Sequence, residues 1–255
     1  LLRLHRFPKP VIVLADGITM GAGLGLAASA DIAVATERTR MAMPETRIGF
    51  FPDVGATGWM FSKCPEGYPE YLGLTGYEMV GAEAVRVGFA SHLLSSERLP
   101  ELVTELEGYS GNLSQTRSQG AKTLFAQLDH FFDKNIPINP DMDEWVAVYF
   151  AGKSSMVEIM ESLRQCTIQT QLCDGVFSRL AERSPTAVVL TLKLLRHNET
   201  QPLEEVFRAD LKAARFIVAH PDYVEGVRAR LVDKDDKPQW QPPTLEEVGD
   251  LDVDL

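Results

Sequence analysis

Near the start of the chain, a short apolar segment is followed at once by a glycine-rich turn and then by a segment of small residues. Residues 11–15 are apolar and mostly β-branched, and they follow Lys9-Pro10, which predicts a buried strand rather than an amphipathic helix. Residues 17–30 are rich in glycine and alanine and predict a turn that leads into a helix. The predicted order in this segment is therefore strand, turn, helix.

Short strands and helices alternate through the next part of the chain. We predict strands at residues 31–36 and 40–43, a helix at 81–88 that ends at a capping glycine, and a strand at 89–94. Residues 44–58 contain prolines and glycines that interrupt any regular period, which predicts a loop. Short units of both kinds at this density predict a layered α/β core.

The second half of the chain has a different pattern. Between residues 108 and 140 the polarity rises and the periodicity weakens, which predicts a domain seam or a variable connection. Ser184-Pro185 supplies an N-cap and a first-turn proline for a helix, and residues 203–218 form a longer amphipathic pattern. We therefore divide the chain into a core at residues 1–107 and a mainly helical region at residues 108–255.

Composition narrows the classes of function. The 255 residues are 45% hydrophobic and can bury a substantial core. The net charge of -11 argues against direct nucleic-acid binding, which relies on clustered Lys and Arg. The sequence contains no run of about 18 apolar residues, so we predict no membrane span. The chain has three cysteines, Cys64, Cys166 and Cys173. Their number is odd and their spacing is not that of a metal site, so we predict free thiols.

Two segments could carry chemistry. In the turn Gly21-Ala22-Gly23, amides at the start of a helix could hold a carbonyl oxygen as it becomes negative, although tight packing also explains small residues here. Glu45 follows Pro44 at the end of a predicted strand. Apolar neighbours would raise its basicity, as suits a general base or nucleophile; the alternative is a solvated loop side chain.

Asp53 lies eight positions after Glu45 on the same predicted loop, with aromatic residues before it and glycine after it. Two carboxylates on one loop could act as a base and an acid in separate roles. The alternative, which can hold at the same time, is that Asp53 is the N-cap of the next helix.

Several short sequence blocks, taken together, point to a protein family more specifically than any one of them does alone. The blocks are residues 8–13, 16–26, 35–37, 42–46, 48–49, 51–55, 71–76, 184–186, 225–229, 233–235 and 238–240. In order and spacing they resemble the crotonase (enoyl-CoA hydratase/isomerase) superfamily, and in particular its 3-hydroxyisobutyryl-CoA hydrolase branch. The resemblance covers most of the chain and is weakest between residues 108 and 180.

This resemblance implies a crotonase-like spiral of ββα units with a C-terminal helical region, an α/β fold whose N-terminal part is missing here. It implies that Ala22, where the family usually has glycine, supplies one backbone amide of the oxyanion hole. It also implies that Glu45 is the principal catalytic carboxylate, and that Asp53 addresses the 3-hydroxyl end of the substrate or transfers a proton. Plain hydratases of the superfamily usually have glycine at the position of Asp53, which favours thioester hydrolysis.

The implied reaction converts 3-hydroxyisobutyryl-CoA to 3-hydroxyisobutyrate and CoA in valine catabolism. It needs no metal and no cofactor, since CoA is part of the substrate, and the CoA-binding residues are not identified by the sequence. The alternatives are a non-catalytic component of a larger assembly such as a mitochondrial small ribosomal subunit, and an enoyl-CoA hydratase or isomerase. The implied compartment is the mitochondrial matrix in a eukaryote and the cytoplasm in a bacterium, and the implied partners are copies of the chain or, in the assembly alternative, other proteins.

Overall fold

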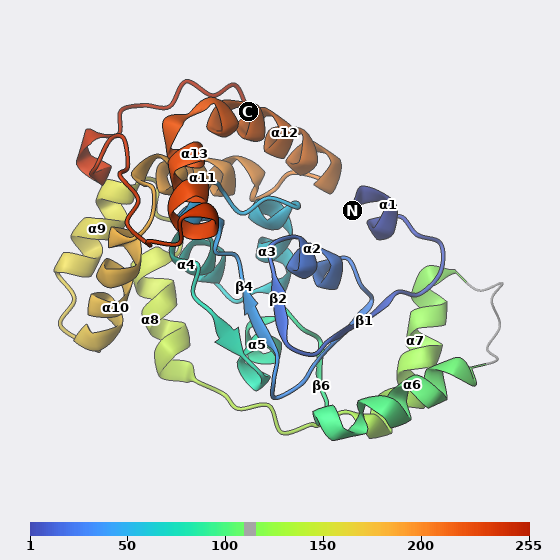
Figure 1. The fold of residues 1–255 in the computed structure, drawn as a ribbon. Helices are drawn as coiled ribbons and strands as arrows, with labels where there is room; N and C mark the ends of the chain where they lie inside the picture. The colour runs from blue at the N-terminus through green and yellow to red at the C-terminus, as the bar shows by residue number, and fades with distance from the viewer. Residues whose placement is uncertain (110–115) are drawn as a thin grey trace. The chain divides into compact units, whose positions relative to one another are not determined.

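The computed structural model describes residues 1–109 and 116–255 (Figure 1). The chain forms two compact units. The first comprises Leu1–Ala42 and Glu78–Ile138, and the second comprises Met43–Tyr77 and Asn139–Leu255. The division of the chain at residues 107 and 108 stays a prediction.

In its described residues, the first unit contains two small three-stranded sheets. Its elements are α1 (Leu2–His5), β1 (Ile12–Ala15), β2 (Ile18–Met20), α2 (Ala22–Ala28), β3 (Ile32–Ala35), β4 (Arg40–Ala42), β5 (Met79–Val80), α5 (Ala82–Val87), β6 (His92–Leu93), η2 (Ser96–Arg98), α6 (Leu99–Glu107), α7 (Arg117–Leu128) and η3 (Asp129–Phe131). One sheet has the order β1-β3-β6, with all neighbours parallel. In the other, β2 pairs with β4 in parallel and β4 pairs with β5 antiparallel.

The core of the first unit lies on the β1-β3-β6 sheet. β1 and β3 pair in register from Ile12 opposite Ile32 to Ala15 opposite Ala35, and β3 is buried along its whole length, as is usual for a parallel strand with a neighbour on each side. Helices α6 and α7, drawn in green in Figure 1, contribute to the same apolar cluster. Its buried members are Ile32, Val34, Leu94, Leu102, Leu124, Leu128, Phe131 and Phe132.

The second unit is mainly helical. Its elements are η1 (Glu45–Ile48), α3 (Ala56–Lys63), α4 (Tyr68–Thr75), α8 (Pro140–Phe150), α9 (Met156–Arg164), α10 (Thr170–Ala181), α11 (Pro185–Asn198), α12 (Leu203–Ala219), α13 (Pro221–Val227), the π-helical turn η4 (Arg228–Val232) and η5 (Leu245–Glu247). Helices α11 and α12 contact each other and form one apolar cluster together with Phe51. The hydroxyl of Ser184 accepts the Ala187 amide at 3.0 Å, which confirms the predicted cap of α11.

Most of the predicted elements are confirmed. The strands predicted at residues 11–15, 31–36 and 40–43 are β1, β3 and β4, and the helix predicted at 81–88 is α5 with Gly88 as its left-handed cap. The layered α/β class is confirmed for the first unit. The predicted loop at 44–58 contains the short turn η1, where Glu45 lies.

The seam predicted at residues 108–140 holds more structure than its periodicity indicated. Residues 110–115 lie outside the described residues, but α7 follows them and α8 begins at Pro140. The buried positions of α7 are Gly120, Leu124 and Leu128, only one per turn, so its apolar pattern is sparse. Helix α8 has its own start signal, because the side chain of Asn139 accepts the Met142 amide at 3.2 Å.

The prediction of three free thiols is wrong for two of them. Cys166 and Cys173 form a disulfide, whereas Cys64 is a free cysteine. Residues 166–173 connect the end of α9 to the first turn of α10, and this short connection brings the two Cα atoms to 6.9 Å. A cysteine count cannot reveal such a local approach.

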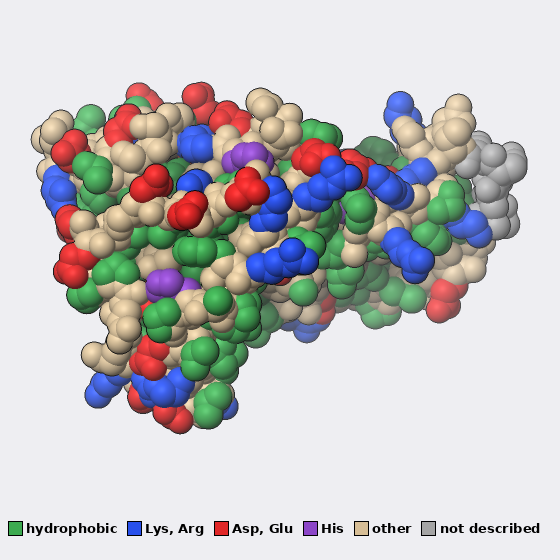
Figure 2. All heavy atoms as spheres, turned by 90° about the horizontal axis from the view of Figure 1, so that it is seen from above, with side chains coloured by type: hydrophobic (Ala, Val, Ile, Leu, Met, Phe, Trp, Pro, Cys, Tyr) green, Lys and Arg blue, Asp and Glu red, His purple; other side chains and the backbone are tan. Residues whose placement is uncertain are grey.

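The described part of the chain contains no helix with the length and apolar character needed to cross a bilayer. On the face shown in Figure 2, Lys and Arg side chains lie among Asp and Glu side chains. The net charge of -11 therefore does not make that face uniformly acidic.

Candidate active site

Glu45 is a buried carboxyl group without a hydrogen-bonding partner for one of its oxygens. It is the first residue of η1, its exposed fraction is 9%, and its Oε2 atom finds no partner among the described residues. The pKa of Glu45 is raised to about 8, mainly by burial; a backbone hydrogen bond opposes this increase, and the negative charge of Asp53 contributes to it. The alternative of a solvated loop glutamate is therefore wrong.

The turn that carries Glu45 is held on several sides. The carbonyl oxygen of Thr46 accepts the Ser184 amide at 3.1 Å, at the start of α11. At the end of η1, Gly226 of α13 packs so closely that a Cβ there would collide with the backbone carbonyl of Ile48. The sequence blocks around residues 184 and 226 therefore contribute to the site by fixing η1.

Asp53 occupies the turn that leads into α3. It is half-buried, and burial raises the pKa of its carboxyl group. The backbone N-cap of α3 is Gly55, and no side chain forms a capping hydrogen bond there, so the N-cap alternative for Asp53 is wrong. Since the charge of Asp53 raises the pKa of Glu45, the structure brings these two predicted residues together in the second unit.

Sequence reasoning missed a third carboxyl group, Asp210. It lies on the buried stripe of α12, its exposed fraction is 7%, and its Oδ2 atom accepts the Gly55 amide at 2.8 Å. The pKa of Asp210 is raised to about 7, mainly by burial; the hydrogen bond from Gly55 opposes this increase, and the charge of Asp53 contributes to it. The available signal was an acidic residue among Val206, Ala209 and Ala213, in the apolar stripe of an amphipathic helix.

These three carboxyl groups form one electrostatic system. The charge of Asp53 raises the pKa of both Glu45 and Asp210, so the three groups resist ionising together. At pH 7, Glu45 is mainly protonated and Asp210 is about half protonated, given their pKa values of about 8 and about 7. Groups that exchange protons near neutral pH can serve as general acids and bases.

Ala22 lies in the first unit, as the first residue of α2. It follows Gly21, whose φ of 51° is readily accessible to glycine, so the glycine-rich turn leads into the helix as predicted. The first amides of a helix have no acceptor within the helix, which leaves the Ala22 amide available to another acceptor. Its assignment to the oxyanion hole stays a prediction.

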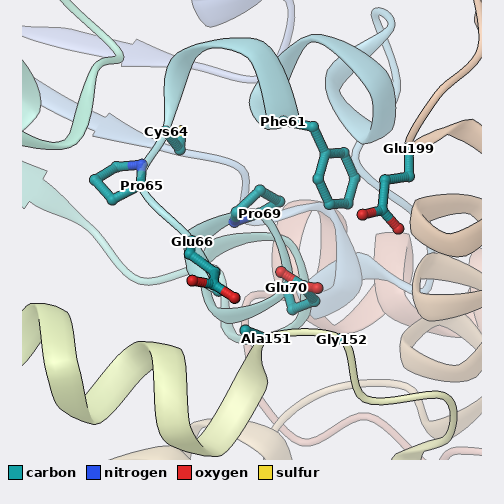
Figure 3. Close-up of a pocket in the computed structure, with 10 residues that line it drawn as sticks. Phe61, Cys64, Pro65, Glu66, Pro69, Glu70, Ala151, Gly152 and Glu199 are labelled. Carbon is teal, nitrogen blue, oxygen red and sulfur yellow. The ribbon is translucent and has the colours of Figure 1, made fainter.

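A cavity of about 340 Å³ lies elsewhere in the second unit (Figure 3). Phe61, Cys64 and Glu70 are among its lining residues, and the carboxylate of Glu70 pairs with Arg196. Burial raises the pKa of the Cys64 thiol to about 12, so this cysteine is not a nucleophile at neutral pH. None of the predicted site residues lines this cavity.

Among the described residues, no group of three or more His, Cys, Asp or Glu side chains is arranged to hold a metal ion.

Comparison with curated proteins finds relatives named 3-hydroxyisobutyryl-CoA hydrolase. Residues along 96% of the chain are 35% identical to a mitochondrial 3-hydroxyisobutyryl-CoA hydrolase of Gallus gallus, and 32% identical to the human protein of the same name. The matches span 63% and 62% of those proteins, so the chain covers less than two thirds of their length.

Solved structures give the same fold. A carnitinyl-CoA dehydratase of Mycobacterium thermoresistibile matches 97% of the chain with a TM-score of 0.78 and 31% identity, over 67% of its own length. An enoyl-CoA hydratase of Rhodobacter sphaeroides matches 97% of the chain with a TM-score of 0.80 and 29% identity, also over 67% of its length. The family model described as enoyl-CoA hydratase/isomerase matches residues 2–255. The chain therefore belongs to the enoyl-CoA hydratase/isomerase family of the crotonase superfamily.

Proposed function

We propose that this protein hydrolyses the thioester bond of an acyl-CoA, and that its substrate is 3-hydroxyisobutyryl-CoA. The observation that carries the proposal is the pairing of Glu45, a buried carboxyl group with a pKa of about 8, with Asp53, whose charge raises that pKa. The names of the 3-hydroxyisobutyryl-CoA hydrolases that share 32% to 35% of their residues with the chain support the choice of reaction and acyl group.

In the proposed reaction, the deprotonated Glu45 either attacks the thioester carbonyl or takes a proton from a water molecule that attacks it. A carbon–oxygen bond forms, the carbon–sulfur bond breaks, and the CoA sulfur leaves and is protonated to the thiol. If Glu45 attacks directly, water then cleaves the mixed anhydride and regenerates the carboxylate. Asp53 contacts the 3-hydroxyl end of the acyl group or supplies the proton, which its half-buried position and raised pKa support.

A second candidate is hydration or dehydration of an enoyl-CoA, because the two solved structures at about 30% identity carry the names of a dehydratase and a hydratase. The two reactions differ in their products. Hydrolysis releases a thiol, whereas hydration removes the conjugated double bond and leaves the thioester intact. Asp53 favours hydrolysis, since hydratases of the superfamily usually have glycine at this position.

The test uses the natural full-length protein and its Glu45→Gln and Asp53→Asn variants, each confirmed to be folded by thermal denaturation. Chromatography measures CoA release from 3-hydroxyisobutyryl-CoA, and ultraviolet absorbance follows the double bond of crotonyl-CoA. We expect CoA release by the wild type and a loss of about a hundredfold or more in both variants. Loss of crotonyl-CoA absorbance without thiol release would replace hydrolysis by hydration.

An inactive but folded wild type would favour the non-catalytic alternative, a component of a larger assembly. For a eukaryotic protein we propose the mitochondrial matrix, in line with the mitochondrial names of the relatives.

A further inference from the structure

The turn that carries Asp53 has a backbone conformation that most side chains avoid. Val54 has a φ of 56°, and Gly55, the next residue, has a φ of 76°. The left-handed region is unfavourable for a β-branched residue and costs on the order of 1–3 kcal/mol. Such a turn persists only where neighbouring groups hold it in place.

Besides the bonds that the Gly55 carbonyl oxygen accepts from α3, three hydrogen bonds hold this turn. The amide of Ala56 donates to the carbonyl oxygen of Asp53 at 2.9 Å, and the indole Nε1–H of Trp59 donates to the carbonyl oxygen of Val54 at 3.3 Å. Both of these donors belong to α3, directly after the turn. The third bond comes from a distant part of the sequence: the Gly55 amide donates to Oδ2 of Asp210, 155 residues later, at 2.8 Å.

An aspartate at position 210 lowers the stability of the folded protein. It interrupts the apolar stripe of α12, and its second oxygen, Oδ1, is buried without a hydrogen-bond partner in the described part of the chain. A buried acceptor without a partner costs about 1–3 kcal/mol. An alanine or leucine at this position would continue the apolar stripe without that cost, so packing alone does not explain an aspartate.

We propose that Asp210 is a positioning residue, which holds the strained turn at Val54 and Gly55 so that the Asp53 carboxyl group lies where the reaction needs it. This inference rests on the proposed function, because it assigns Asp210 to the placement of a group that the proposed hydrolysis uses. Asp210 acts through Asp53 and does not contact the substrate.

The activity test compares Asp210→Ala, which removes the acceptor, with Asp210→Asn, which retains a carbonyl oxygen that can accept the Gly55 amide. Glu205→Ala, on the partly exposed side of the same helix, is the matched control. All assays run well below the melting temperature of each variant. We expect Asp210→Ala to lower kcat for CoA release about 10- to 100-fold with KM changed less than about threefold, as for a small misplacement of a reacting group.

We expect Asp210→Asn to keep kcat within about fivefold of the wild type, and Glu205→Ala to leave it unchanged. Because Asp210 acts through Asp53, adding Asp210→Ala to Asp53→Asn should cause little further loss. A folded Asp210→Ala variant with wild-type kcat would overturn the proposal. So would a double variant whose loss equals the product of the two single losses, because Asp210 would then act independently of Asp53.

A second measurement needs no substrate. In protein labelled with ¹⁵N-glycine, the amide signal of Gly55 should shift upfield and exchange with solvent faster in Asp210→Ala than in the wild type, while Asp210→Asn retains most of the protection. An unchanged Gly55 signal in Asp210→Ala would overturn the proposal even in an active enzyme. If Asp210→Ala changes the Gly55 signal in this way but the wild type releases no thiol, the proposed hydrolysis is overturned. The catalytic purpose of Asp210 is then overturned with it.

Discussion

Burial gives Glu45 a pKa of about 8, which sets the pH range in which it can act. A carboxyl group serves as a base or nucleophile only after it loses its proton, so the active fraction of the free enzyme rises with pH. We expect kcat/KM for CoA release to increase tenfold per pH unit below about pH 7 and to level off above about pH 9. Measurement of kcat/KM from pH 5.5 to 9.5, corrected for spontaneous hydrolysis, checks this. A profile that is flat across this range would contradict the assignment of Glu45.

The raised pKa of Glu45 also predicts that stability depends on pH, which can be measured without a substrate. Because folding raises the pKa of Glu45 from 4.5 to about 8, the contribution of its proton to stability is fully present below about pH 4.5 and is lost as pH rises toward 8. Glu45→Gln lacks this loss. We expect the variant to be more stable than the wild type by about 4 kcal/mol at pH 7.5, with the difference shrinking toward pH 4.

Urea denaturation at several pH values measures this difference. Glu161→Gln, at an exposed position of α9, is the control and should show no comparable dependence on pH. If Glu45→Gln were less stable than the wild type at pH 7.5, the Glu45 carboxylate would have stabilising contacts in the folded protein that the structure does not show.

The predicted role of the Ala22 backbone amide can be tested by a substitution that removes its hydrogen atom. Proline is well tolerated at the first position of a helix, where Ala22 lies, and it has no amide hydrogen to donate. If the Ala22 amide belongs to the oxyanion hole, Ala22→Pro should lower kcat about a hundred- to thousandfold, whereas Ala22→Gly, the usual family residue, should retain activity. Steady-state assays of both variants, with circular dichroism to confirm folding, check this. Equal activities in the two variants would remove Ala22 from the site.

Individual residues show how far sequence reasoning reaches. Glu45 and Asp53 became candidates because they lie on one predicted loop, and the resemblance to the crotonase superfamily implied their catalytic roles. Asp210 was missed because it reaches the same turn from a helix 155 residues away, and no local pattern records that contact. The capping role considered for Asp53 was wrong, because a glycine at a φ of 76° already begins α3.

At the scale of elements, the position of Glu45 depends on the close approach of α13 to η1. These two elements contact each other, and Gly226 of α13 leaves no room for a Cβ against the backbone of Ile48. Alanine is otherwise the better helix former, so any loss on substitution must come from the collision. We expect Gly226→Ala to reduce stability by about 1–3 kcal/mol and to reduce kcat as η1 shifts.

Thermal denaturation and CoA-release assays of Gly226→Ala measure both effects. Gly249→Ala is the matched control, since a Cβ at Gly249 meets no atom within 4 Å. A Gly226→Ala variant that is as stable and as active as the control would show that α13 does not constrain η1.

Elements with a dense apolar pattern were predictable, and those with a sparse one were not. Helices α11 and α12 present long buried stripes and were predicted with their starts. Helix α7 buries one residue per turn, and α8 follows the polar segment 133–139, so weak periodicity was interpreted as a seam. The resemblance to known sequences was weakest in the same region.

At the scale of the whole molecule, each compact unit has an apolar core of its own. The cluster around the β1-β3-β6 sheet lies entirely in the first unit, and the cluster of α11, α12 and Phe51 lies entirely in the second. The order of the family's sequence blocks predicted the superfamily fold. It did not predict this division, in which residues 43–77 and residues 139–255 form one unit, because chain order does not record which segments share a core.

Separate cores predict that a cavity in one unit weakens that unit first. Leu128 and Leu194 are fully or almost fully buried in the first and second cores, and replacing either with alanine should cost about 2–5 kcal/mol. Hydrogen exchange followed by mass spectrometry should then show faster exchange in α6 and α7 for Leu128→Ala, and in α11 and α12 for Leu194→Ala. If both variants lost protection equally throughout the chain, the two units would unfold as one cooperative body. If Leu128→Ala instead loses protection only in the first unit, the second unit keeps the carboxyl groups of Glu45, Asp53 and Asp210 in place while the first unit opens.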